Sequence, residues 1–259
     1  MPASEAQLRV VALRYQELLG RLSARTAAQV GVLWDRLGGI DDAAQARFAR
    51  AAAQVVEASQ RQAAMLADAY IRTYLRQLEG GAVAGTVDAA AATAARGVPA
   101  VEVYARPTVT ARKALADGRT LLEALRTARD RATSAADVDV KLAARQASRD
   151  AMIAAGVTHY RRVPDSTACT FCLTASTQRY AAADLMPLHN RCGCTVAPLR
   201  ADAPLVIDRD LRDRLRAASG RDDYWNDPKA AIAVREHGEL GPVLVQADHQ
   251  FTTAADAAA

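Results

Sequence analysis

Aromatic side chains and lysine are scarce in this chain. Phe, Trp and Tyr together make up 5 % of its 259 residues, and lysine occurs only as Lys113, Lys141 and Lys229. Much of the 51 % apolar content is alanine, which buries little area per residue. The composition therefore excludes a thick aromatic core and favours a thin core between helices.

Long apolar runs and familiar catalytic patterns are also missing. No apolar run approaches the roughly 20 residues that span a bilayer. The first residues, MPASEAQLRV, lack the basic start and apolar centre of a secretory signal. We expect a soluble protein made in a reducing cytosol. The sequence contains no H-E-x-x-H, G-x-S-x-G or Walker pattern, so we expect no enzymatic activity.

Cysteine is absent from the chain except in one stretch, residues 169–194. The spacing there is Cys169-x2-Cys172 followed by His189-x2-Cys192-x-Cys194. Two residues between cysteines let both thiolates reach one ion from a tight turn, and in a reducing compartment clustered cysteines favour a metal over disulfides. A closed set of thiolate and imidazole ligands is typical of structural zinc.

The sequence thus predicts a structural Zn²⁺ site held by Cys169, Cys172, His189 and one of Cys192 and Cys194. Four sulfurs without the histidine, a cluster without metal, and paired disulfides remain alternatives. A zinc deaminase would need H-x-E before its cysteines, whereas His237-Gly238-Glu239 follows them. A thioredoxin-like role would need a parallel α/β context that the sequence does not show.

The spacing of apolar residues predicts long helices before the cysteines. One runs from Ser4 to about Leu37 and ends at a Gly-Gly pair, and a second begins at Asp41 or Asp42 and ends before Gly80-Gly81. Two long helices with a short break indicate an antiparallel hairpin.

The next part of the chain is less regular. Residues 80–105 are alanine-rich, forming a weak helix or a loop, with Pro99 and Pro107 as breaks. A basic helix is predicted from Thr108 to about Arg131, and another helix capped by Ser134 and closed by Gly156.

Short strands are predicted on both sides of the cysteines, at 157–163 and 194–199. A helix at 206–218 and a strand pair within 230–245 follow. The predicted fold class is α+β, mainly α, with a long N-terminal helical hairpin or bundle followed by a small zinc-stabilised module with short β-strands. The predicted divisions are an N-terminal helical region (1–104), a basic helical pair (105–156), a zinc-binding core (157–200), and a helix and strand extension with a frayed end (201–259).

Positive charge gathers in the segment that leads into the cysteines. Residues 105–162 carry 12 basic and 6 acidic side chains. Such a segment can lie on phosphates or on an acidic protein surface, and a solvated helix face is the alternative. Arg161 and Arg162 are candidate contacts for phosphate, DNA or a partner, or caps of the cysteine stretch.

The residues around the cysteines resemble a known family. They are Arg162-Val163-Pro164, Cys169-Thr-Phe-Cys172, Tyr180, the run from Asp184 to Cys194 (DLMPLHNRCGC), and VREHGELGP at 234–242. Together they resemble the MuF-like head-morphogenesis module of tailed bacteriophages, in the form found in phages of actinobacteria, over about residues 151–245. Residues 157–200 are then the MuF-like core.

The resemblance implies a minor capsid protein carried in few copies near or inside the portal region, which assists head assembly and DNA packaging and ejection. It implies portal protein and capsid proteins as partners, phage DNA as a further one, no membrane contact before infection, and oligomeric association only in the particle. The location would be the host cytoplasm during assembly and then the virion, in the capsid interior or at the portal vertex. A zinc-stabilised nucleic-acid-binding module is the alternative function.

Overall fold

Helices α1 (Glu5–Asp35) and α2 (Asp42–Glu79) begin and end close to the predicted positions. The residue before α2, Asp41, caps it, because its Oδ1 accepts a hydrogen bond of 2.8 Å from the backbone N–H of Ala44. Gly38 and Gly80 adopt positive φ of 72° and 75° after the two helices, a conformation that glycine enters without steric cost. The predicted helix pair is confirmed.

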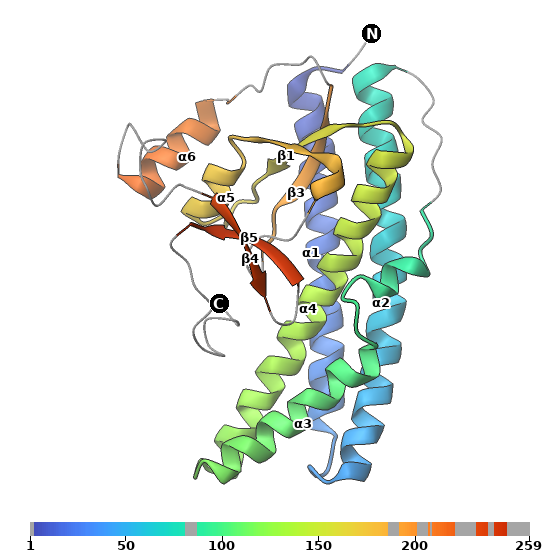
Figure 1. Ribbon diagram of the computed structural model, residues 1–259, viewed down its shortest axis with the longest axis vertical. Coiled ribbons are helices and arrows are strands. Elements are labelled where there is room, and N and C mark those ends of the chain that lie inside the picture. Colours follow the sequence, from blue (N-terminus) through green and yellow to red (C-terminus); the bar gives the residue numbers. More distant parts are fainter. Residues whose placement is uncertain are drawn as a thin grey trace. The chain divides into compact units, whose positions relative to one another are not determined.

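The computed structural model places helices over most of the chain and confines strands to its later part, which confirms the mainly helical α+β class (Figure 1). Further elements are a short 3₁₀ turn η1 (Ala91–Ala94), α3 (Ala100–Ala116), α4 (Leu121–Ala154), β1 (His159–Val163), α5 (Thr170–Ala175), β2 (Arg179–Ala181), η2 (Ala182–Asp184), β3 (Thr195–Leu199), α6 (Arg209–Ser219), β4 (Ile232–His237) and β5 (Gly241–Gln246). The structure describes residues 3–80, 87–185, 192–200, 207, 209–220, 232–237 and 241–247. Within those ranges, no helix combines the length and the apolarity that crossing a membrane requires.

The predicted basic helix from Thr108 to Arg131 is wrong. The chain breaks after α3 at Gly118, whose φ is 81°. A capping box then starts α4: Glu123 Oε2 accepts the backbone N–H of Thr120 at 3.0 Å, and Thr120 Oγ1 accepts that of Glu123 at 3.3 Å.

Two smaller expectations also fail. Ser134 does not cap a helix, because it lies inside α4, which continues without a break to Ala154. Pro107 does not end a segment, because it lies buried inside α3, where Pro99 serves as the N-cap. Residues 100–154 therefore form two helices, α3 and α4, which are separated at residues 117–120.

The described chain divides into two compact units. Unit 1 contains residues 1–18, 66–87 and 145–259, and unit 2 contains residues 19–65 and 88–144, masked residues apart. Helices α1, α2 and α4 each contribute residues to both units.

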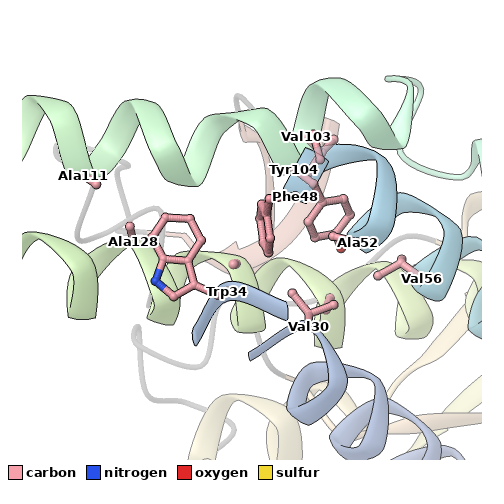
Figure 2. Packing of buried hydrophobic residues seen from close by; sticks show 12 residues of the cluster. Val30, Trp34, Phe48, Ala52, Val56, Val103, Tyr104, Ala111 and Ala128 are labelled. Atoms are coloured by element: carbon pink, nitrogen blue, oxygen red, sulfur yellow. The ribbon is translucent and has the colours of Figure 1, made fainter. Parts of the chain in front are cut away.

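The core of unit 2 is built from a few large side chains and many alanines. Trp34 meets Phe48 edge to face, with ring centroids 5.1 Å apart and an interplanar angle of 83° (Figure 2). Val30, Val56 and Tyr104 pack around them. The small buried residues of the same cluster let the helix backbones approach closely: Ala49, Ala52, Ala111, Ala128, Ala132 and Ala136. This is the thin, alanine-lined core that the composition predicts.

Unit 2 also buries an ion pair. Arg96 Nε lies 2.5 Å from Asp139 Oδ1, and both side chains are at most 4 % exposed. The hydroxyl of Tyr104 donates to the other carboxylate oxygen at 2.7 Å. The carboxylate is thus paired and hydrogen-bonded, which is the condition under which a buried charge is tolerated.

Unit 1 holds the sheet. The strand order is β2–β1–β3, with both neighbours antiparallel to β1, and Tyr160 is opposite Tyr180 on one side and Pro198 on the other. The strands predicted at 157–163 and 194–199 are confirmed, whereas β2 was not foreseen. The Tyr70 hydroxyl donates to the carbonyl of Val196 at 2.7 Å, which fixes β3 to α2 within unit 1.

The end of the described chain follows expectation. Helix α6 lies within the predicted 206–218 helix apart from its last residue. Strands β4 and β5 form the predicted strand pair, which the structure shows to be antiparallel, with Val234 opposite Leu244. Residues 248–259, predicted to be frayed, lie outside the described residues.

Candidate metal centre

The cysteines are presented by α5 and by the residues just before β3. Cys169 is the N-cap residue of α5 and is exposed, whereas Cys172 lies one turn later and is buried. The C-x2-C pair is therefore on a short helix rather than in a tight turn. Cys192 and Cys194 lie immediately before β3 and are buried.

Three of the four thiols form a compact cluster. The Sγ atoms of Cys172, Cys192 and Cys194 all lie within 4.8 Å of one another. Those of Cys172 and Cys192 are 3.5 Å apart. Zn–S bonds of about 2.3 Å in a tetrahedral site place two sulfurs about 3.8 Å apart. The donor atoms present thus fit a thiolate-rich metal site.

The protonation of these thiols is governed by their proximity. The hydrogen bond with Cys169, then those with Cys192 and Cys194, and then burial raise the pKa of Cys172 well above its ordinary value. At Cys194 the hydrogen bond from Cys172 lowers the pKa, but the contact with Cys192 and burial outweigh it and the pKa is raised. Crowded thiols therefore stay neutral by themselves, whereas a bound cation favours their thiolates.

Not every predicted ligand joins the cluster. Cys169 lies outside the three-thiol group, although its thiol hydrogen-bonds with that of Cys172. His189 lies outside the described residues. The structure brings both Cys192 and Cys194 beside Cys172. Both thiols are therefore close enough to bind one ion, whereas the sequence predicted that only one of them would.

Apolar side chains surround the cluster. Phe171 and Ala175 come from α5, and Leu244 comes from β5. Ile232 of β4 packs against the same group. Sequence reasoning identified the β4–β5 hairpin but not its position against the cysteines, because no local pattern reports such a long-range contact.

Polar contacts fix the backbone on both sides of the cysteines. The guanidinium of Arg145, on α4, donates to the carbonyl of Cys192 at 3.2 Å. Asp165 Oδ1 accepts from the backbone N–H of Thr167 at 2.9 Å. A β-carbon added to Gly193 would lie 1.8 Å from Asp165 Oδ2, so any larger residue between Cys192 and Cys194 would have to displace this carboxylate. Sequence reasoning missed both Arg145 and Asp165.

Arg161 and Arg162, the two candidate phosphate contacts, lie on opposite faces of β1. Arg162 is 1 % exposed and its Cζ lies 5.3 Å from the ring centroid of Tyr180 and 5.8 Å from that of Tyr160. Arg161 is partly exposed and forms a 2.7 Å salt bridge with Glu5 of α1. The guanidinium of Arg162 is therefore held within unit 1 against two aromatic rings, which stabilise its charge.

One known protein family matches most of this chain. A model of the VG15 protein family matches residues 8–216, a segment that contains all four cysteines. No curated protein and no solved structure matches.

The fold and the cluster define a mainly helical protein with a buried three-thiol centre that could hold a metal ion. The family match is more specific. The chain belongs to the VG15 protein family, and it is therefore a bacteriophage protein.

Proposed function

We propose that this protein is a minor capsid protein of a tailed bacteriophage, of the MuF-like type, with a structural role in head morphogenesis near the portal and in DNA packaging and ejection. The observation that supports this most is the coincidence of two features. Among the residues that carry the MuF-like resemblance, Cys172, Cys192 and Cys194 form the buried thiol cluster, and Phe171 and Tyr180 pack against it. They also fall within the segment that matches a phage protein family.

The metal of this centre is Zn²⁺ in our proposal. Cys172, Cys192 and Cys194 supply three thiolates, and the fourth ligand is Cys169 or His189. When bound, zinc contributes folding energy directly, on the order of 10 kcal/mol for small zinc-binding peptides at neutral pH. The burial of the three thiols supports a structural role and not a catalytic one, because a catalytic zinc keeps one position open to substrate. We assign no enzymatic activity.

The proposed role in the head is tested by asking whether the protein is present in phage particles. Mass spectrometry of purified virions and of procapsids is expected to detect it in few copies relative to the major capsid protein. Affinity purification of the protein from infected cells is expected to recover portal or capsid protein. Absence from both particle types would overturn the assignment, and a non-structural phage protein serves as the control for contamination.

The alternative, a zinc-stabilised nucleic-acid-binding module, has weaker support. Base stacking needs accessible aromatic rings, but Tyr160 and Phe171 are buried. Strong DNA binding that falls steeply with salt and is lost in Arg161→Gln would favour this alternative.

A further inference from the structure

A small cavity opens in unit 1 beside β1. Its volume is about 40 Å³, and α1, α2, β1 and α6 all contribute to its lining. Among the described residues, the charged side chains that line it are four arginines and one carboxylate: Arg9, Arg161, Arg162, Arg214 and Asp210. The thiol cluster contributes none of its cysteines to this lining.

Guanidinium groups outnumber carboxylates among the described side chains that line the cavity. Asp210 pairs with Arg9 at 2.5 Å, and Glu5 pairs with Arg161 at 2.7 Å. Arg214 donates to the backbone carbonyl of Asp165, and the guanidinium of Arg162 lies against Tyr160 and Tyr180. The lining thus presents an entering anion with four guanidinium groups and one carboxylate.

The guanidinium groups are also held in place before any ligand arrives. Each of the four is fixed by a salt bridge, a backbone carbonyl or an aromatic face, and they come from three different elements. Donors that are already oriented lose little side-chain entropy on binding. Tyr74, which hydrogen-bonds with Arg161, adds a further polar group to the lining.

We propose that this cavity binds a phosphate group. Guanidinium groups donate paired hydrogen bonds in the geometry that phosphate oxygens accept. A volume of about 40 Å³ holds a few water-sized groups, which suits one tetrahedral oxyanion and not a nucleoside. The phosphate is either free or the terminal phosphate of a larger molecule such as a DNA end, and the chemistry of recognition is the same for both.

The first test uses the full-length protein and inorganic phosphate, with binding measured by calorimetry. In Arg9→Gln the affinity should fall about tenfold, as expected for the loss of a charge-assisted hydrogen bond. Arg129→Gln is the matched control, because Arg129 is 41 % exposed and pairs with a 53 % exposed Asp35, against 38 % and 52 % for Arg9 and Asp210. The control should bind phosphate as the wild type does.

A second variant separates binding from stability. Asp210→Asn removes the carboxylate that competes with the ligand for Arg9, so phosphate affinity should rise several-fold while the salt bridge is lost. Asp35→Asn, its counterpart in unit 2, should leave the affinity unchanged. A merely structural ion pair predicts no gain of affinity in either variant.

The source of the phosphate is distinguished by competition. Displacement of inorganic phosphate by a 5′-phosphorylated oligonucleotide, but not by the same oligonucleotide with a 5′-hydroxyl, identifies a DNA end as the ligand. Displacement by neither identifies free phosphate. The proposal is overturned if inorganic phosphate does not bind at millimolar concentration, or if Arg9→Gln and Asp210→Asn bind it as the wild type does.

Discussion

Gly193 lies directly against the carboxylate of Asp165. A β-carbon at position 193 would lie 1.8 Å from Oδ2 and 3.0 Å from Cγ of that side chain. Asp165 has little freedom to retreat, since its other carboxylate oxygen accepts hydrogen bonds from the backbone N–H and the hydroxyl of Thr167. The turn between Cys192 and Cys194 is therefore shaped by a residue almost 30 positions earlier.

Substitution of this glycine should disturb the thiol cluster. We expect Gly193→Ala to lower the free energy of unfolding by about 1–3 kcal/mol, the usual cost of overpacking, and to reduce metal content. Urea denaturation and metal analysis measure the two effects. Gly20→Ala is the control, because nothing lies within 4 Å of its added carbon, and in helix α1 it should stabilise by about 0.5–1 kcal/mol. Adding Asp165→Ala to Gly193→Ala should recover part of the loss.

Removal of a buried thiol should remove the metal. Purified protein is expected to contain about one zinc per chain, and either a chelator or Cys172→Ser should lower the melting temperature of unit 1. The reason is that the thiolates of the cluster are expected to contribute folding energy only when a cation binds them. A preparation without metal whose melting curve does not change in chelator would contradict the zinc proposal.

Substitution of the exposed Cys169 tests which residue is the fourth ligand. If Cys169 binds the metal, Cys169→Ser should lower zinc affinity as Cys172→Ser does. If His189 is the ligand instead, His189→Ala should have the larger effect, and Cys169→Ser should retain stoichiometric zinc. Competition with a coloured zinc chelator measures both affinities.

The buried ion pair of unit 2 gives a prediction of stability. Asp139→Asn leaves the guanidinium of Arg96 buried without its countercharge, so we expect a loss of about 3–5 kcal/mol. Asp35→Asn removes the partner of Arg129 at an exposed site and should cost at most about 1 kcal/mol. If urea denaturation gives equal losses for the two variants, burial does not determine how much the Arg96–Asp139 pair contributes to stability.

Buried tyrosines predict the response to alkaline pH. Burial, and then Asp139, raise the pKa of Tyr104 well above its usual value, and burial does the same for Tyr70. The fold thus favours the neutral phenol, and this stability is fully present below the unfolded pKa of about 10 and lost as pH rises above it. The absorbance of phenolate should therefore rise together with loss of helical circular dichroism. Full phenolate formation near pH 10 in a protein that keeps its helices would contradict the expectation.

Much of the helical part could be predicted because its signals are local. Apolar spacing and terminal glycines located α1 and α2 to within a few residues. The break at Gly118 is not predicted, although Thr120 and Glu123 carry the capping-box pattern, because the apolar spacing on both sides of it fits one continuous helix. Ser134 was misleading since a hydroxyl inside a helix can be satisfied without ending it.

The candidate site was only partly predictable for the opposite reason. Cysteine spacing located the centre, but three-dimensional pairing determines which thiols meet: Cys169 shares a helix with Cys172 and lies outside the compact group. The burial of Arg162 against two stacked tyrosines could not be predicted from its charge. Contacts from Arg145 and Leu244 depend on segments far away in sequence.

The position of the β4–β5 hairpin has a consequence for synthesis. Leu244 and Ile232 pack against the cysteine cluster, yet they leave the ribosome about 40 residues or more after Cys194. At roughly 5–20 residues per second, that interval lasts at least about two to eight seconds. All four cysteines are therefore synthesised before the hairpin that packs against them. A cation can reach the thiols from solvent during this interval. Once the hairpin has packed against the cluster, we expect the same contacts to slow the exchange of any bound ion and to shield the sulfurs from oxidants.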